Sequence, residues 1–166
     1  GHGELDRDTE EGFWIPSDAR RDDPSTYIPV DRIRKQIKAM SAKHVMVVAD
    51  SCFSGSLTRS TLTRALKVKP RSPEYQTELQ RIIDKKSRTA LTSGGLEPVL
   101  DSGGDGHSVF ASAFISALRD NSGVLDAHEL FIQVRKKVRN NSPQDPEYTP
   151  IYETGHDHGD FLFVRR

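Results

Sequence analysis

The chain has 166 residues, with 24 basic and 24 acidic side chains and a single cysteine. This length suits one domain, and the balanced charge argues against a protein whose main role is to bind nucleic acid. One cysteine can form neither an internal disulfide nor a cysteine-rich zinc site. Because no apolar run could cross a bilayer and no charged-then-apolar leader opens the chain, we expect a cytoplasmic protein that does not bind membranes.

The predicted elements begin after a polar, loop-rich stretch over residues 1–29, in which only residues 13–15 are typical of a short strand. From 30 to 40, apolar residues recur at helical spacing and basic residues occupy the other face, which predicts an amphipathic helix. Residues 45–49 are an uninterrupted apolar run rich in β-branched side chains. This run predicts a central strand buried on both faces, as in a parallel sheet, and it ends abruptly in the polar segment 50–55.

The middle of the chain begins with a basic linker at about 56–73, which contains five basic side chains and no acidic one. A helix is predicted near 74–86, followed by a strand over 88–93. A Gly-rich loop over 96–107 comes next.

The last third of the chain carries two helix caps. Ser108 is expected to cap a very apolar helix that ends at Leu118. Asp126 and Glu129 stand at capping-box spacing before a further helix, and residues 161–164 predict a final strand. This order of strands and helices points to a layered α/β fold, in which the loops that leave the carboxyl ends of the strands hold the chemistry.

Two short motifs carry the candidate chemistry. His2 lies between two glycines, and Cys52 lies in the polar segment that follows the predicted strand over 45–49. A thiol attacks a carbonyl only as the thiolate, and a nearby imidazole can take its proton. Residues this far apart in the chain can meet when each lies at the end of a neighbouring parallel strand, so His2 and Cys52 are a candidate base and nucleophile.

With these motifs the chain resembles the caspase-like cysteine peptidases, in particular the metacaspases and bacterial caspase homologues. A His about fifty residues before the Cys is a mark of that family. The matching segments are His2-Gly3, Asp50-Ser51-Cys52-Phe53-Ser54-Gly55, Thr92-Ser93-Gly94 and Gly159-Asp160-Phe161. The resemblance implies one caspase-like peptidase domain over residues 1–166, built as a three-layer α/β sandwich with a mostly parallel central sheet. It also implies that amino-terminal strands of this sheet are missing from the sequence, and the low hydrophobic content of 34% fits that expectation.

Carried over to this chain, the resemblance makes Cys52 the nucleophile and His2 the base. The backbone N–H groups of Gly3 and Cys52 would form the oxyanion hole, and no third catalytic residue is expected. Metacaspase-like enzymes hold a basic substrate side chain with acids at positions that correspond to Asp50 and, in a looser alignment, Asp101. We therefore expect cleavage after Arg or Lys.

The resemblance also bears on processing, cofactors and partners. Because the family is often cut soon after the nucleophile, we expect self-cleavage in the basic linker. The candidate positions are Arg59, Arg64, Lys67, Lys69 and Arg71. No cofactor is required, but some metacaspases need calcium, and residues 101–106 resemble part of a calcium loop, so calcium is a candidate activator. The expected partners are peptide or protein substrates with Arg or Lys before the scissile bond, and an upstream or fused regulatory or sensor module.

Three alternatives stay open. Asp50 can be an ordinary cap at the end of a strand. The segment 156–160 contains His and Asp residues of the kind that bind metals, although a solvated turn without a metal is the preferred interpretation. The domain can also be a catalytically silent scaffold that acts as a protein-binding or regulatory module, against which the presence of both His2 and Cys52 argues.

Overall fold

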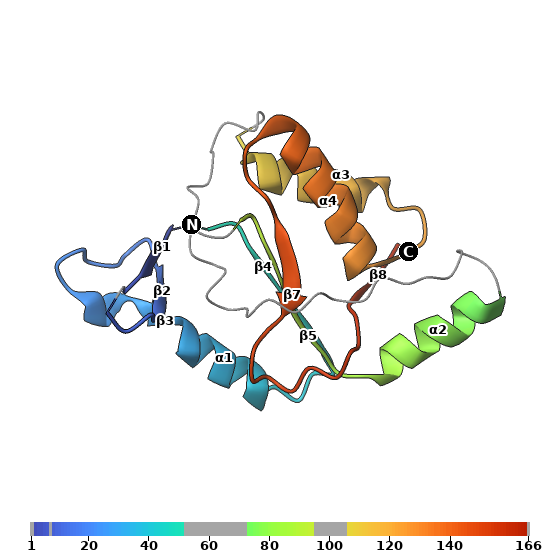
Figure 1. Cartoon of the computed structure of the whole chain (residues 1–166), viewed down its shortest axis with the longest axis horizontal. Helices are drawn as coiled ribbons and strands as arrows, with labels where there is room; N and C mark the ends of the chain where they lie inside the picture. The colour runs from blue at the N-terminus through green and yellow to red at the C-terminus, as the bar shows by residue number, and fades with distance from the viewer. Residues whose placement is uncertain (1, 7, 52–72, 95–105, 166) are drawn as a thin grey trace.

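The computed structural model describes residues 2–6, 8–51, 73–94 and 106–165. The described strands form two sheets of three strands and one sheet of two strands. A small antiparallel sheet lies at the amino terminus, and a larger α/β unit follows it (Figure 1).

The amino-terminal sheet consists of β1 (His2–Leu5), β2 (Gly12–Ile15) and β3 (Ile28–Pro29), in the order β1-β2-β3. The prediction of a loop-rich stretch with one strand is confirmed for β2 but wrong for β1 and β3. β1 alternates between exposed and half-buried residues and has no apolar stripe, and β3 has only two residues. Both are strands because they pair with β2, and nothing in their own sequence marks them.

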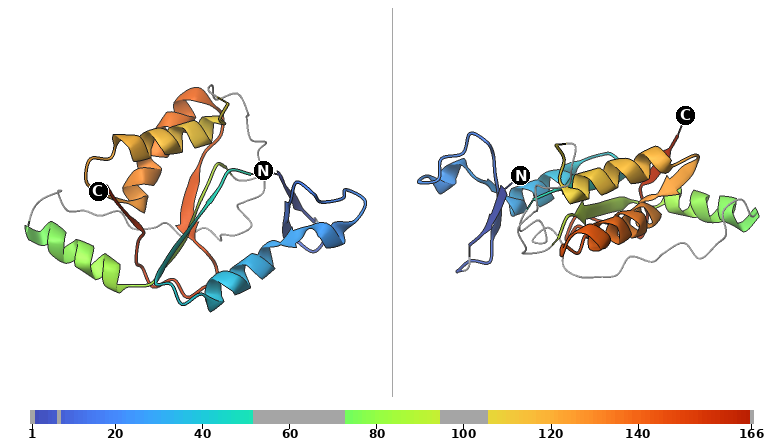
Figure 2. Two further views of the ribbon diagram at one scale, coloured as in Figure 1. Left: turned by 180° about the vertical axis from the view of Figure 1, so that it is seen from behind. Right: turned by 90° about the horizontal axis from the view of Figure 1, so that it is seen from above.

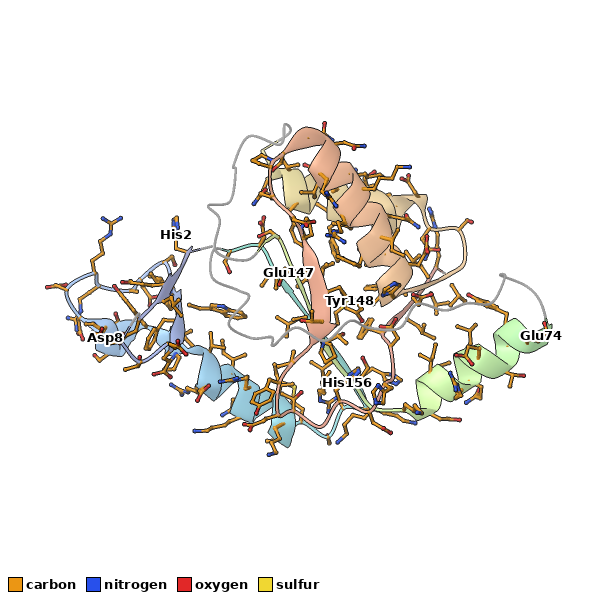
Figure 3. The ribbon with its side chains drawn as sticks, in the orientation of Figure 1. His2, Asp8, Glu74, Glu147, Tyr148 and His156 are labelled. Carbon is orange, nitrogen blue, oxygen red and sulfur yellow. The ribbon has the colours of Figure 1, made fainter. Side chains whose placement is uncertain are left out.

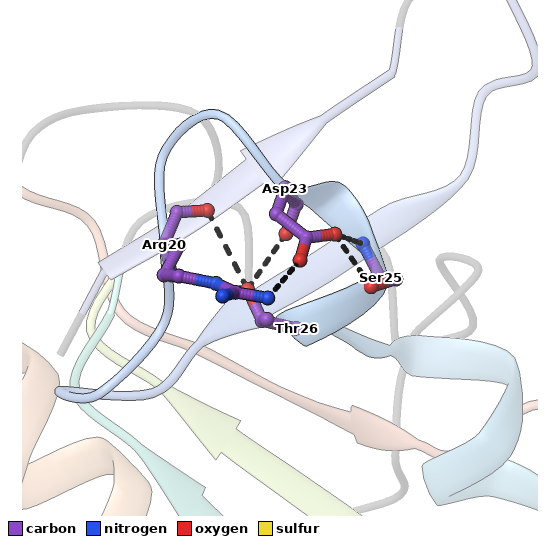
Figure 4. A network of polar contacts seen from close by, with 4 residues as sticks. All are labelled: Arg20, Asp23, Ser25 and Thr26. Atoms are coloured by element: carbon purple, nitrogen blue, oxygen red, sulfur yellow. Dashed lines mark hydrogen bonds and ion pairs between the residues drawn. The ribbon is translucent and has the colours of Figure 1, made fainter.

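The connection between β2 and β3 is closed by a single turn of 3-10 helix, η1 (Pro24–Thr26). The Asp23 carboxylate accepts hydrogen bonds from the Ser25 backbone N–H at 3.2 Å and from the Ser25 hydroxyl at 2.5 Å, and it pairs with Arg20 (Figure 4). The Thr26 hydroxyl donates to the carbonyl of Asp23 at 2.7 Å. This local network returns the chain so that β3 pairs with β2 and continues directly into the first helix.

That helix, α1 (Val30–Ala39), confirms the prediction for residues 30–40. Its buried residues Val30 and Ile37 pack with Ala90 and Ile151. The partly buried residues around this cluster are Trp14, Ile33, Val45 and Val47. Since Trp14 belongs to β2, the same apolar cluster attaches the amino-terminal sheet to the main sheet.

The main sheet consists of β4 (His44–Ala49), β5 (Ser87–Thr92) and β7 (Glu147–Pro150), in the order β4-β5-β7. β4 and β5 run parallel, and β7 runs antiparallel to β5. The strands predicted at 45–49 and 88–93 are therefore confirmed, but the prediction that the first is central and buried on both faces is wrong. Among the described strands β5 is central and buried at every residue, whereas β4 pairs with β5 alone and is mostly half-buried.

Two more helices complete the layers: α3 (Val109–Asp120) and α4 (Ala127–Asn141), which pack against each other. Neighbouring strand residues point to opposite faces of a sheet. Ala90 accordingly packs with α1, while Leu91 packs with α3 and α4 in a second cluster. The sheet thus lies between α1 on one face and the α3–α4 pair on the other, which confirms the predicted three-layer α/β sandwich. In Figure 2 the amino-terminal sheet lies beyond one edge of this unit, away from α3 and α4.

The predicted caps of these two helices are confirmed. The Ser108 hydroxyl accepts a hydrogen bond from the backbone N–H of Ala111 at 2.9 Å. The Asp126 carboxylate accepts one from the backbone N–H of Glu129 at 2.8 Å. Each cap satisfies an N–H group that has no partner within the helix.

The remaining elements are α2 (Pro73–Asp84), β6 (Val124–Asp126) and β8 (Leu162–Val164). The helix predicted near 74–86 and the last strand are confirmed, whereas β6 and β7 were not predicted. β6 and β8 pair antiparallel in the two-stranded sheet. Within the described ranges, no helix combines the length and apolar character that crossing a membrane requires.

The amino end of β5 is closed by Arg88, whose side chain is fully buried. Its two terminal nitrogens donate to the backbone carbonyls of Met40, Ala42, Lys43 and Ser87. Burial lowers the pKa of this guanidinium, because no water solvates its charge. The backbone N–H of Arg88 donates to Nδ1 of His156 at 3.2 Å. One arginine therefore joins the end of α1, the start of β5 and the turn that contains His156.

Candidate active site

The structure describes three of the predicted site residues, namely His2, Gly3 and Asp50. The predicted nucleophile Cys52 and the predicted second acid Asp101 lie outside the described residues, as does the calcium-loop candidate except for its last residue. The five self-cleavage candidates, Arg59, Arg64, Lys67, Lys69 and Arg71, also lie outside them. The geometry of the site therefore comes from the residues that precede the nucleophile in the chain and from those that pack around them.

His2 owes its position to the amino-terminal sheet. In the register of β1 and β2, His2 lies opposite Ile15 and Gly3 lies opposite Trp14. Trp14 in turn packs with the cluster that joins α1 to the main sheet. His2 is thus positioned by the pairing of β1 with β2 and by the packing of β2 against α1. It does not belong to a strand of the main sheet.

A pocket of about 320 Å³ lies where the amino-terminal sheet meets the carboxyl end of β4. Most of its walls are apolar, and its polar lining comes from both sides of the meeting point. The lining residues are His2, Trp14, Ile15, Pro16, Ile28, Val48, Ala49, Asp50 and Ser51. Figure 3 shows His2 at the end of β1 that lies toward the main sheet. The fold thus brings an imidazole to the two residues that immediately precede Cys52.

The chain that leads into Cys52 is held on two sides. On one side, the backbone N–H of Ser93 donates to the carbonyl of Ala49 at 3.1 Å, which extends the pairing of β4 and β5 by one residue. On the other, the Ser108 hydroxyl donates to Oδ2 of Asp50 at 2.5 Å. Ser51 is buried, with 8% of its surface exposed. The segment at the carboxyl end of β4 is therefore fixed by β5 and by the start of α3.

The contact between Ser108 and Asp50 was not predicted from the sequence. Ser108 was expected only as a helix cap, and its second partner is 58 residues away in the chain. The two segments meet because β4 ends beside the start of α3, which depends on the order of strands in the sheet. A Ser that caps the helix after a Gly-rich loop at a sheet edge is the one sequence feature that marks this position.

The carboxyl end of β5 carries two more buried polar groups beside the pocket. The hydroxyls of Thr92 and Ser93 make no hydrogen bond to any residue that the structure describes. Their residues are 1% and 0% exposed. Both belong to the segment 92–94 that contributed to the resemblance, and they lie at the same sheet edge as the chain leading into Cys52.

The segment 156–160 anchors the fold at its carboxyl end, so its interpretation as a solvated turn is wrong there. The Asp160 carboxylate accepts hydrogen bonds from the hydroxyl of Tyr148 and from two backbone N–H groups, those of Phe161 at 2.7 Å and His128 at 3.2 Å. Burial raises the pKa of Asp160 and also raises that of Tyr148. Across the described ranges, no cluster of three or more His, Cys, Asp or Glu side chains could hold a metal ion.

Gly159 in the same segment is required by close packing. A Cβ atom at this position would lie 2.5 Å from the carbonyl oxygen of Lys85, closer than real Cβ contacts allow. The matching segment Gly159–Phe161 therefore has structural roles: the glycine permits close approach and the aspartate anchors the chain before β8.

One pocket is thus lined by an imidazole (His2), a carboxylate (Asp50) and the residue that precedes the cysteine in the chain (Ser51). An imidazole beside a thiol can take its proton, and a carboxylate in the same pocket can bind a cation. In a comparison with known proteins, the family described as Caspase domain matches residues 1–157. No curated protein matches the chain.

Proposed function

Since the chain belongs to the caspase domain family of cysteine peptidases, we propose that it is an active cysteine endopeptidase with a dyad of His2 and Cys52. The observation that carries the proposal is the shared pocket: His2 lines it together with Ser51, the residue that precedes the thiol. A silent scaffold would need neither an imidazole at this place nor a pocket around it.

The proposed reaction proceeds through an acyl-enzyme. The His2 imidazole takes the proton of the Cys52 thiol, and the thiolate adds to the carbonyl carbon of the scissile peptide bond. The negative charge on the carbonyl oxygen is stabilised by the backbone N–H groups of Gly3 and Cys52. The C–N bond then breaks, and the amine leaves with the proton that His2 had taken. A water molecule, deprotonated by His2, attacks the thioester and releases the carboxylic acid and the thiol.

Substrate specificity is proposed to come from charge. Asp50 lines the pocket, and a carboxylate there favours Arg or Lys before the scissile bond. The apolar side chains of Val48 and Ile28 can pack against the methylene stem of such a residue while its charged end reaches the carboxylate. Asp101 is proposed as a second acid of the same pocket.

Self-processing follows from the same specificity. The basic linker at 56–73 begins four residues after Cys52. It therefore contains the first peptide bonds after Cys52 that follow an Arg or Lys residue. We expect active protein to be converted to fragments over a prolonged incubation, with cleavage at one or more of the five basic linker residues. Protein with Cys52→Ala should stay intact, and an intact band for both forms would contradict self-processing.

The experiment that tests the function compares two fluorogenic peptides, one with Arg and one with Asp before the reporter group. The wild-type protein should release the reporter from the Arg peptide and not from the Asp peptide. Both peptides are measured with and without calcium, because calcium is a proposed activator that the reaction does not require. Cys52→Ala should abolish release while its circular dichroism spectrum stays unchanged. Equal activity in Cys52→Ala would refute Cys52 as the nucleophile, and no cleavage by the folded wild-type protein would favour the scaffold function instead.

A further inference from the structure

Ser108 has two hydrogen-bond partners, and one of them is the pocket acid. Its hydroxyl accepts from the backbone N–H of Ala111 at 2.9 Å and donates to Oδ2 of Asp50 at 2.5 Å. A serine hydroxyl has one proton and two lone pairs, so both bonds can form at the same time. The cap of α3 needs only the accepted bond. The donated bond is therefore additional, and it ties the first turn of α3 to the carboxylate that lines the pocket.

The start of α3 is a fixed point in the molecule. Its residues Phe110, Ala113 and Ala117 are 1%, 5% and 0% exposed and pack in the same core cluster as Leu91 of β5. Moving the first turn would expose this apolar surface, which is unfavourable. The core therefore positions the Ser108 hydroxyl, and the hydrogen bond from this hydroxyl restricts the orientation of the Asp50 carboxylate.

We propose that Ser108 is a positioning residue for substrate recognition, which rests on the proposed preference for Arg or Lys. By binding Oδ2, Ser108 fixes the plane in which the Asp50 carboxylate meets a cationic side chain. A guanidinium pairs with a carboxylate through two parallel N–H···O bonds, and this geometry is lost when the carboxylate rotates. A carboxylate that is already oriented also loses less conformational freedom on binding.

The test measures binding rather than turnover. Ser108→Gly and Ser108→Thr are made in intact protein that carries Cys52→Ala, and each is titrated calorimetrically with an Arg peptide and with the same peptide containing citrulline. Citrulline keeps the shape of arginine without its charge. Gly retains most of the capping stabilisation but has no hydroxyl, whereas Thr retains the hydroxyl. Ser108→Gly should weaken binding of the Arg peptide about tenfold, the equivalent of one hydrogen bond to a charged group, and change citrulline binding less than about twofold. Ser108→Thr should behave like the parent.

The ratio of the two affinities within one variant is independent of how stable that variant is. Equal weakening of the binding of both peptides in Ser108→Gly, or no weakening of either, would overturn the inference.

The outcomes also separate this inference from the proposed function. If the wild-type protein fails to cleave the Arg peptide but Ser108→Gly still weakens its binding selectively, the peptidase function fails and the positioning role stands. If the wild-type protein cleaves after Arg and Ser108→Gly discriminates as well as the parent, the function stands and the positioning role fails. Failure to bind either peptide would overturn both.

Discussion

The two ends of the main sheet use buried polar side chains in different ways. At the amino end of β5, the terminal nitrogens of Arg88 bond to four backbone carbonyls and its N–H bonds to His156. At the carboxyl end of β4, Asp50 accepts a hydrogen bond from Ser108, which caps α3, and also lines a pocket. The terminal nitrogens of Arg88 thus bond to backbone carbonyls, whereas Asp50 bonds to another part of the chain and also lines a pocket.

This difference separates stability from chemistry. A buried charge whose terminal nitrogens bond to backbone carbonyls ties distant segments together, and removing it leaves those carbonyls without a donor. Polar groups around a pocket contribute little to the fold but are available to a substrate. Substitutions at the amino end should therefore lower the free energy of unfolding without affecting turnover, and substitutions at the carboxyl end should do the reverse.

The largest expected effect is at the carboxyl end, with His2→Ala. Loss of the proposed base should lower kcat/KM for an Arg peptide roughly 10³–10⁴-fold, because the thiol would lose its proton acceptor and the leaving amine its donor. The midpoint of urea unfolding should not change, since His2 is exposed. Glu4→Ala, an exposed position on the same face of β1, is the matched control and should keep full activity. A His2→Ala protein that retains a tenth of the activity would place the base elsewhere.

The next effect is at the amino end, with Arg88→Met. The aliphatic volume is kept, but four carbonyl groups lose a donor, so the free energy of unfolding should fall by about 3 kcal/mol. Urea unfolding measures this loss, and kcat/KM per folded molecule should stay at the wild-type value. Arg119→Met removes an exposed arginine and should change stability by less than about 0.5 kcal/mol. Similar stabilities for the two variants would refute the separation of the two ends.

Gly159→Ala should have an intermediate effect at the same end. The new methyl group would lie 2.5 Å from the carbonyl oxygen of Lys85, so the turn before β5 must shift. Overpacking of this kind costs about 2 kcal/mol, which thermal unfolding would detect. Gly123→Ala is the control, because a Cβ atom there would have no atom within 4 Å and the φ angle is ordinary. A Gly159→Ala protein as stable as wild type would show that the turn yields without cost.

The smallest expected effect is a pH dependence at the amino end. Burial and the neighbouring His158 lower the pKa of His156 below its usual value of 6.5, and its Nδ1 accepts the N–H of Arg88. The unfolded chain therefore binds this proton more readily than the folded protein. The stabilisation is present above pH 6.5 and is lost as the pH falls through the folded pKa. His156→Asn keeps an acceptor without a titrating group, so its unfolding free energy should fall less between about pH 7 and pH 5 than that of wild type. Identical pH profiles would contradict the assignment.

Elements with their own apolar pattern could be predicted from the sequence. α1, α3 and α4 have apolar stripes, and Ser108 and Asp126 provide local capping signals, so these helices and two of their starts follow from neighbouring residues. β1 and β3 could not be predicted because their pairing with β2 creates them. The placing of β4 failed for a related reason: its apolar run indicates a strand but not which strand lies at the centre.

Arg88 shows why the central strand was hard to recognise. A charged residue in a strand normally indicates an exposed face, yet Arg88 is fully buried because four carbonyls from two segments converge on it. The same holds at the candidate site. The residue types at His2, Cys52 and Asp50 indicated the chemistry, but the bond from Ser108 to Asp50 depends on the sheet order and no short-range pattern encodes it.

The placement of His2 on a separate sheet has a consequence for the order of folding. β1 and β2 pair from Leu5 and Gly12 outward, so only a short turn must close. β4 and β5 pair from His44 and Ser87, so each of their contacts must first close a loop of about 43 residues at a greater entropic cost. The hairpin that carries His2 can form early, while the wall of the pocket that leads into Cys52 is completed only with the long-range pairing. His2 and the strand that precedes the predicted nucleophile thus depend on contacts of very different sequence separation.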